Sequence, residues 1–273
     1  MADIAVVTGA SSGMGLHAAV ELARGGLTVV ATMRDPARAG ALLAEAAQAG
    51  VELDVRALDV TDEVGALRCL DGVIADHGGI QLLVNNAGQG SLGTAEQLSM
   101  DQIRDQLAVN YLGPVLLTKA VLPGMRQAGR GRILTVTSVG GVVGQPFADA
   151  YCGAKFAVEG FMQSLAVVAE RFGVWVSVIE PGAVASAFVA NVSRTSESGP
   201  YAELLSAYLS RTAGAFANAQ TAQQAGAAIA AAATSPDYRF RWQSSDSAAA
   251  FVGTSLTDLD GSRVLDATRA WLG

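Results

Sequence analysis

Short apolar runs alternate with longer amphipathic segments through most of the chain. The runs are rich in Val, Ile, Leu and Thr, which is typical of strands buried on both faces of a parallel sheet. They lie at Ile4–Thr8, Thr28–Thr32, Leu53–Leu58, Leu82–Val84, Ile133–Thr137 and Val174–Ile179. The segments between them are long enough for crossover helices, at 13–25, 36–49, 62–77, 99–127 and 151–172. This alternation predicts an α/β fold, with a doubly wound parallel sheet flanked by helices.

The alternation is interrupted after the sixth apolar run, in residues 187–218. Ser193 to Pro200 is a polar stretch and predicts a mobile loop. Ala222–Thr234 is rich in alanine, which favours a helix, and a last strand is expected near Tyr238–Trp242. Because no Pro/Ser-rich linker and no internal repeat divides the chain, residues 1–273 are expected to form one domain.

Composition excludes several classes of protein. With 51% hydrophobic and 16% charged residues, the chain is not intrinsically disordered. Its 25 acidic and 18 basic residues give a net charge of −7, which argues against a general nucleic-acid binder. Two cysteines and two histidines are too few for a disulfide framework or a zinc site. The N-terminus lacks the basic start of a signal peptide, and apolar runs are interrupted before they reach the length of a membrane span. We therefore expect a cytoplasmic protein without a metal.

A glycine-rich turn follows the first predicted strand and opens the first predicted helix. It reads Thr8-Gly9-Ala10-Ser11-Ser12-Gly13-Met14-Gly15. Glycines allow a tight turn and let a pyrophosphate approach the backbone, and the helix N-terminus offers unpaired N–H groups to the anion. The alternative is an ordinary βα turn, which its position directly after the first strand disfavours.

Three polar side chains are candidates for acid–base chemistry. Tyr151 and Lys155 are four residues apart, so both lie on one face of a predicted helix, where the ammonium is expected to lower the pKa of the phenol. Ser138 follows the fifth apolar run, and the carboxyl ends of such strands face the ligand crevice. Each residue also has a structural alternative: a chance Tyr–Lys pair, or a serine that caps the loop.

The glycine turn, in the spacing TGxxxGxG, resembles that of the short-chain dehydrogenase/reductase superfamily, and further motifs support the resemblance. Asp59-Val60 matches its adenine-contacting pair, Asn85-Asn86-Ala87-Gly88 its NNAG motif, and Pro181-Gly182-Ala183-Val184-Ala185-Ser186 its PGxVxT motif, with Ser in place of Thr. Asn110, Ser138, Tyr151 and Lys155 match its catalytic tetrad. The spacings match the family over about residues 3–186.

The resemblance implies a Rossmann-type fold and a role for each matched residue. Tyr151 would exchange a proton with the substrate oxygen, Ser138 would orient that oxygen, and Lys155 would bind the nicotinamide ribose. Asn110 would hold a water that connects Lys155 to solvent, although it could instead bond a neighbouring carbonyl. Besides Tyr151 and Lys155, the residues implied in cofactor binding are Gly9, Ser11, Ser12, Gly13, Met14, Gly15, Arg34, Asp59, Val60, Asn86, Ala87, Gly88, Pro181, Gly182, Val184 and Ser186.

The end of the second apolar run indicates which nicotinamide cofactor is used. An acid there accepts the ribose hydroxyls in NAD binders, whereas a nearby arginine suits the 2′-phosphate of NADP. By resemblance the acid position is Met33, and Arg34 follows it, with Ser12 as a second donor. The sequence therefore predicts NADP(H), with a surface Arg34 paired to Asp35 as the alternative.

A narrower resemblance concerns the substrate. Ser138-Val139-Gly140-Gly141, Pro146-Phe147 and Lys155-Phe156-Ala157-Val158-Glu159-Gly160 look like the 17β-hydroxysteroid and retinol dehydrogenase branch, which implies a bulky, apolar ketone or secondary alcohol. In this family the region corresponding to 187–218 forms the substrate lid; it shows no comparable match, and Gln145 adds polarity. Reduction of sugar or polyketide carbonyls, and a non-catalytic NADP-binding regulator, remain as alternatives. The apolar helices 99–127 and 151–172 predict a homo-oligomer, a dimer or tetramer.

Overall fold

Seven parallel strands form the central sheet of the computed structural model, which describes residues 2–185, 193–194, 199–217, 219–260 and 262. Their order is β11-β7-β6-β4-β1-β2-β3, so the chain reverses its direction of travel between β1 and β4. The strands are β1 Ile4–Thr8, β2 Thr28–Met33, β3 Asp54–Ala57, β4 Leu82–Asn85, β6 Gly131–Val136, β7 Val174–Glu180 and β11 Arg241–Gln243. The predicted doubly wound fold is confirmed, and such a reversal is where open α/β sheets bind ligands.

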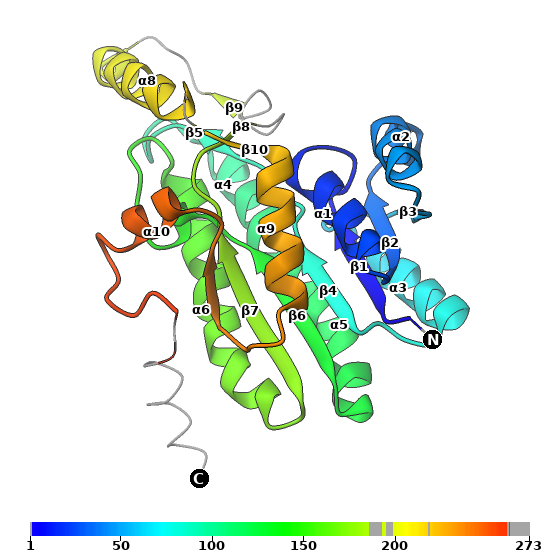
Figure 1. Ribbon diagram of the computed structural model, residues 1–273. Helices are drawn as coiled ribbons and strands as arrows, with labels where there is room; N and C mark the ends of the chain where they lie inside the picture. Colours follow the sequence, from blue (N-terminus) through cyan, green and yellow to red (C-terminus); the bar gives the residue numbers. More distant parts are fainter. Residues whose placement is uncertain (1, 186–192, 195–198, 218, 261, 263–273) are drawn as a thin grey trace.

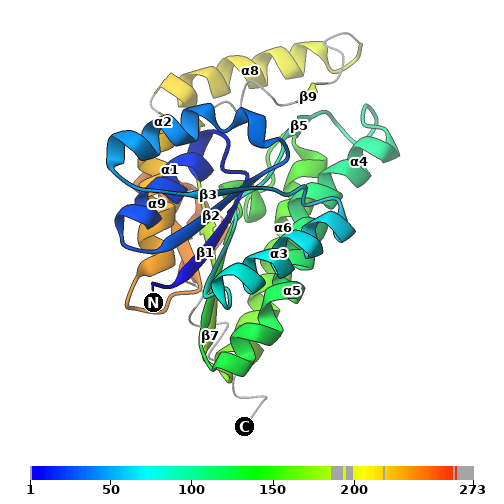
Figure 2. The ribbon, with the colours of Figure 1, turned by 90° about the vertical axis from the view of Figure 1, so that its right-hand side faces the viewer.

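Helices cover both faces of the sheet, as Figures 1 and 2 show. On one face lie α1 Gly13–Arg24, α2 Gly40–Ala49 and α9 Ala222–Thr234; on the other lie α3 Glu63–His77, α4 Met100–Leu107, α5 Gly113–Ala128 and α6 Asp149–Glu170. Each face has its own apolar core, with Leu22 and Ile229 on the first and Leu117 and Met162 on the second. The sheet is thereby shielded on both sides, as its continuous apolar strands require.

Smaller elements gather near the carboxyl ends of the strands. They are η1 Pro36–Arg38, β5 Ser91–Leu92, the π-helical turn η2 Ala108–Leu112, η3 Val139–Gly141, β8 Val184–Ala185, β9 Ser193–Arg194, α8 Ala202–Ala217, β10 Gln220–Thr221 and α10 Asp246–Val252. Figure 2 shows α8 above this end of the sheet. The α8 helix was not predicted from the sequence. Of the predicted loop Ser193–Pro200, residues 195–198 lie outside the described part of the chain.

One stretch of the described chain, Met100–Ala128, is long and apolar enough to cross a membrane as judged by length and composition alone. It comprises α4, η2 and α5 and is interrupted by Pro114 and Pro123. Its inner side packs on the sheet through side chains such as Leu117 and Val121. The stretch therefore acts here as a covering layer of the α/β fold.

Candidate active site

The glycine turn after β1 is tied to the end of β4 by hydrogen bonds. Asn86 Nδ2 donates to the carbonyl oxygens of Thr8 at 2.8 Å and Gly9 at 3.2 Å. In return, Thr8 Oγ1 accepts from the backbone N–H groups of Asn86 and Ala87, each at 3.0 Å. Two of the motifs that the sequence predicts are thus one structural unit at the switch point of the sheet.

The turn is too crowded for side chains. Gly9 has a φ of 68°, and a Cβ there would lie 2.8 Å from Ala87 Cα. A Cβ on Gly15 would overlap Asn86 Nδ2 and lie 2.6 Å from the Gly9 carbonyl oxygen. Ser12, the N-cap of α1, makes no capping hydrogen bond with its side chain within the described part of the chain. The first N–H groups of α1 are therefore left to bind an anion such as a phosphate.

Replacing Gly15 by alanine is expected to lower stability, because the new methyl group displaces Asn86 from Thr8 and Gly9. Overpacking of this kind costs about 1–3 kcal/mol. Gly40→Ala is the matched control, since a Cβ at Gly40 meets nothing within 4 Å. Thermal unfolding should show a lower Tm for Gly15→Ala only. Equal Tm values for the two variants would contradict the packing described here.

The end of β2 presents the residues predicted to select the cofactor. Met33 is buried, and Arg34 is exposed and forms no ion pair with any described residue. The Asp35 carboxylate instead accepts a hydrogen bond from the backbone N–H of Ala37 at 3.0 Å and caps η1. The alternative of an Arg34–Asp35 pair is thus not realised, and Arg34 is available to a ligand.

The residues predicted to lie near an adenine follow β3. Asp59 Oδ1 accepts from the Thr61 N–H at 2.9 Å and the Thr61 hydroxyl at 2.7 Å. Val60 is buried, and a Cβ on Gly113 would lie 2.8 Å from its Cβ. Asp59 and Val60 therefore border the same edge of the sheet as the glycine turn, with Asp59 fixed by a local turn.

The two adjacent asparagines after β4 have different environments. Asn85 is buried and its Nδ2 donates to the hydroxyls of Thr118 at 3.3 Å and Thr135 at 3.2 Å, so it joins β4 to α5 and β6. It is the Asn86 side chain that donates hydrogen bonds to the glycine turn. Gly88 follows at a narrow point, where a Cβ would lie 3.0 Å from Asn110 Oδ1 and 3.7 Å from Lys155 Nζ.

Asn110 lies in a π-helical turn that interrupts the helix predicted over 99–127. It is fully buried, and its Nδ2 donates to the Gln89 carbonyl at 2.8 Å and to Gln106 Oε1 at 3.1 Å. Its Oδ1 accepts from the Gln89 N–H at 3.2 Å. Turns of this type are frequent at functional sites. Asn110 does bond a neighbouring carbonyl, as the alternative supposed, and its water-binding role stays a prediction.

Ser138 and Tyr151 meet beyond the end of β6. Ser138 Oγ accepts the Gly140 N–H at 3.0 Å, and the Ser138 side chain is hydrogen bonded to Tyr151. Burial raises the pKa of Tyr151 to about 12, although the bond with Ser138 lowers it. The expectation of a lowered pKa was wrong for the protein alone, because burial outweighs the other effects. At neutral pH the phenol is therefore protonated.

Lys155 is buried one turn beyond Tyr151 on α6. Its Nζ donates to the Val136 carbonyl at 3.0 Å and lies 5.9 Å from the centre of the Tyr151 ring. Burial lowers the pKa of Lys155 to about 8, and the nearby Glu159 raises it. The side chain is thus still mostly charged at neutral pH.

The segment after β7 completes the edge of the site. The Pro181 carbonyl accepts the Val139 N–H at 3.0 Å, so this segment is joined to the loop that carries Ser138. Gly182 packs near Ala248 of α10, and Val184 is buried in β8. Ser186, the last residue of the PGxVxT-like motif and one of the residues implied in cofactor binding, lies outside the described residues.

Two aromatic side chains join the loop before α6 to α8, a contact that the sequence did not indicate. Phe147 is buried with a φ of 62°, and its ring centroid lies 5.6 Å from that of Tyr208 on α8. The Phe147 carbonyl accepts the Gly93 N–H at 2.7 Å. Gln145 is also close, since a Cβ on Gly140 would lie 3.3 Å from both Gln145 Nε2 and Tyr151 Cε1. The loop before α6 thus contributes a buried ring that packs on α8 and an amide close to Tyr151.

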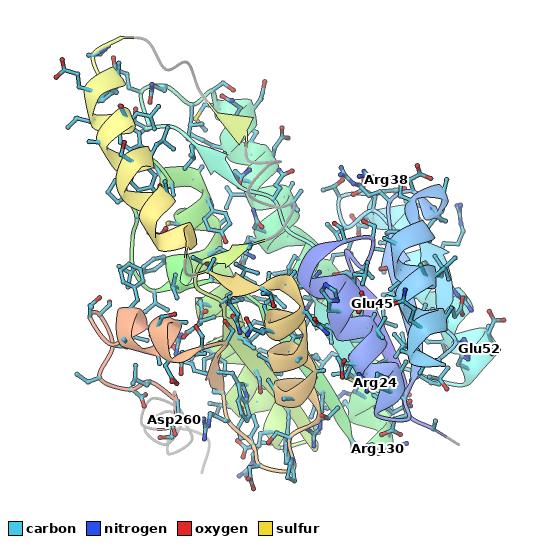
Figure 3. The ribbon with its side chains drawn as sticks, turned by 45° about the horizontal axis from the view of Figure 1, so that its top comes forward. Arg24, Arg38, Glu45, Glu52, Arg130 and Asp260 are labelled. Atoms are coloured by element: carbon cyan, nitrogen blue, oxygen red, sulfur yellow. The ribbon has the colours of Figure 1, made fainter. Side chains whose placement is uncertain are left out.

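Other parts of the described chain offer weaker candidates. No group of three metal-ligating side chains occurs among the described residues. A groove of about 650 Å³ lies at the opposite end of the strands, near Arg130, which Figure 3 labels. Its arginines are already engaged: Arg130 pairs with Asp3, and Arg132 donates to the carbonyls of Ala233 and Ser235. The predicted residues thus mark the better candidate site.

Comparison with known proteins agrees with this site. Residues 3–197 match the short chain dehydrogenase family. The chain is 41% identical over 187 residues to retinol dehydrogenase 8 of Homo sapiens, covering 67% of this chain and 59% of that protein. It is 43% identical over 196 residues to human 17-beta-hydroxysteroid dehydrogenase type 1, covering 69% of this chain and 59% of the relative. The similarity thus spans about three fifths of the length of these relatives.

Two solved structures extend the comparison. A short-chain dehydrogenase from Streptomyces avermitilis has a TM-score of 0.80 at 29% identity, covering 99% of this chain and 94% of that one. A metagenomic short-chain oxidoreductase in complex with NADP has a TM-score of 0.63 at 35% identity, covering 66% of this chain and 82% of the other. The resemblance found in the sequence is thereby confirmed: the chain belongs to the short-chain dehydrogenase/reductase family and is similar to its 17β-hydroxysteroid and retinol dehydrogenase branch.

Proposed function

We propose that this protein is an NADP(H)-dependent oxidoreductase that reduces a bulky, apolar carbonyl compound or oxidises the corresponding alcohol. The observation that carries the proposal is the convergence of Tyr151 with Ser138 and Lys155 beside the glycine turn. Asn110 approaches the same point from η2, as its proximity to Gly88 indicates. A buried phenol, a hydroxyl and an ammonium together provide acid–base chemistry at a carbonyl oxygen.

The chain offers suitable partners for each part of the cofactor. The uncapped start of α1 and the close-packed Gly9 and Gly15 fit a pyrophosphate, and the exposed Arg34 fits a 2′-phosphate. The other positions for the cofactor are Ser11, Ser12, Gly13, Met14, Asp59, Val60, Asn86, Ala87, Gly88, Tyr151, Lys155, Pro181, Gly182, Val184 and Ser186. When bound, a nicotinamide supplies or accepts the hydride.

The residues of the chain handle the proton and the position of the substrate. Tyr151, protonated at neutral pH, donates its proton to the carbonyl oxygen while Ser138 orients that oxygen. The Lys155 ammonium stabilises the phenolate that forms, and a water held by Asn110 connects Lys155 to solvent for proton supply. For alcohol oxidation the same groups act in reverse.

Phe147 and Tyr208 favour an apolar substrate, because their rings lie between the loop before Tyr151 and α8. The names of the relatives, which refer to retinol and hydroxysteroids, point in the same direction. A panel of steroid ketones, retinoid aldehydes, sugars and polyketide-type ketones, each assayed with NADPH, tests the class. Reduction of sugars alone would support the alternative polar class, for which Gln145 is the relevant side chain. If NADPH is not consumed with any compound of the panel, the result would favour a non-catalytic regulator.

The outer surfaces of α6 and the adjoining η2 predict a homo-oligomer. Leu112, Phe156 and Val168 are about half exposed, whereas Leu117 and Val121 of the same apolar stretch are core residues. We expect light scattering at micromolar concentration to give the mass of a dimer or tetramer, and Val168→Glu to reduce it. A monomer mass for the unmodified protein would contradict this expectation.

Three further predictions from the sequence stay predictions. They are a single domain over 1–273, a lid role for 187–218 and a cytoplasmic location.

A further inference from the structure

A group of buried charges lies behind the candidate site. Arg241 of β11 donates from Nη1 to Glu159 Oε2 at 2.6 Å and to Glu180 Oε1 at 2.5 Å. The exposed fractions of the three side chains are 9% for Arg241, 5% for Glu159 and 0% for Glu180. Gln243 Nε2 donates to the second oxygen of Glu180 at 2.8 Å. Burying two carboxylates beside one guanidinium is costly unless further positive charge or hydrogen bonds compensate them.

The group borders two functional segments. Glu159 lies one helical turn beyond Lys155 on α6, and Glu180 directly precedes Pro181. With one guanidinium for two carboxylates, the group has an excess negative charge when both carboxylates are ionised, and the Lys155 ammonium is one helical turn away on α6. Glu159 Oε1 is buried and accepts no hydrogen bond from a described residue. Glu159 lies on the same face of α6 as Lys155, four residues further along, and its charge acts on the Lys155 ammonium.

The surroundings of Lys155 make Glu159 its main charged neighbour. From its own helix it faces Tyr151 and Glu159, and from β6 the Val136 carbonyl. η2 contributes the neutral Asn110 near Gly88. Glu159 is in turn faced by Arg241 from β11, by Glu180 from β7 and by the Thr137 hydroxyl. Burial raises the pKa of Glu159 to about 7 although Arg241 lowers it, so Glu159 is mostly ionised where Lys155 titrates.

We propose that Glu159, held in place by Arg241, is a positioning residue that keeps the buried Lys155 ammonium charged. Its relevance to catalysis rests on the function proposed above. Arg241 is itself held by a segment further along the chain. Its backbone N–H donates at 2.9 Å to the carbonyl oxygen of Asp260, a residue labelled in Figure 3.

The chain has only two lysines, Lys119 and Lys155, which allows a direct test. Protein labelled with ¹³C at lysine Cε gives one NMR resonance for each, and the exposed Lys119 is an internal control. In Glu159→Gln, which keeps the size and an acceptor for Arg241, the Lys155 titration midpoint should fall by about one pH unit. Lys119 should not change. Glu180→Gln is the matched control: it removes a carboxylate that also binds Arg241, and the Lys155 midpoint should not fall.

An unchanged Lys155 midpoint in Glu159→Gln, or an equal fall in both variants, would overturn the proposal. The pH profile of carbonyl reduction separates this claim from the proposed function. We expect the alkaline limb of kcat/KM to move to lower pH by the same amount as the Lys155 titration. The Lys155 midpoint could fall in Glu159→Gln while neither this variant nor the unmodified protein reduces a carbonyl. In that case Glu159 controls the charge of Lys155, and the proposed oxidoreductase function fails.

Discussion

Tyr151→Phe is expected to reduce kcat by on the order of a hundredfold to ten-thousandfold, the usual contribution of a general acid. The variant keeps the ring and loses only the hydroxyl, whose raised pKa of about 12 leaves it protonated and able to donate at neutral pH. NADPH affinity should stay nearly unchanged, because the glycine turn, Arg34 and Lys155 are intact. Steady-state rates, with NADPH binding measured by fluorescence, check both parts.

Tyr238→Phe is the matched control for this change. It also removes one hydroxyl, which donates to the Val176 carbonyl at 3.0 Å, away from Tyr151. Its activity should be close to that of the unmodified protein. If Tyr151→Phe retains more than about a tenth of the original rate, which is well outside the range for loss of a general acid, Tyr151 does not have the proposed role.

Arg34→Ala is expected to weaken NADPH binding by about tenfold to a hundredfold and to leave NADH binding almost unchanged. A hydrogen bond to a charged group is worth roughly 1.5–3 kcal/mol, and a guanidinium can contact a phosphate through two of them. Arg34 is exposed and free of ion pairs with described residues, so no internal contact is lost. Isothermal titration with each cofactor gives the two affinities.

Two further variants sharpen this result. Arg38→Ala removes an exposed arginine of η1, labelled in Figure 3, and should have little effect on either cofactor. Met33→Asp places a carboxylate at the end of β2, where it accepts the ribose hydroxyls of NADH and repels a 2′-phosphate. Combined with Arg34→Ala, it should reverse the preference. Equal weakening of both cofactors by Arg34→Ala would contradict the choice of NADP(H).

Features that depend on local pattern could be predicted from the sequence. The inner strands of the sheet are mostly apolar, as expected where both faces are covered, and the strand bounds differ from the predicted ones by a few residues at most. The glycine turn was predictable because tight turns and close approach limit the residues that fit. The close packing at Gly15 agrees with this explanation, because a Cβ on Gly15 would overlap the side chain of Asn86.

Features that depend on contacts distant in the sequence could not be predicted. The π-helical turn at Asn110 is stabilised by Gln89, and the Glu159–Arg241 pair joins residues 82 positions apart. The Tyr151 pKa was predicted in the wrong direction because the Tyr–Lys spacing shows proximity, whereas burial is set by the whole fold. The α8 helix was hidden in a region where the alternation of strands and helices fails.

Transfer of deuterium from the cofactor to the substrate is the most direct test of the proposed reaction. NADPH carrying deuterium at the nicotinamide C4 is incubated with the protein and the best ketone of the panel, and the alcohol formed is analysed by mass spectrometry. Two isomers of the cofactor are compared, each with deuterium on one face of the nicotinamide C4. We expect one isomer to give an alcohol with one deuterium at the former carbonyl carbon, and the other isomer to give an alcohol without deuterium. An absence of deuterium from the alcohol with both cofactor isomers, or of any alcohol from every ketone tested, would contradict the account.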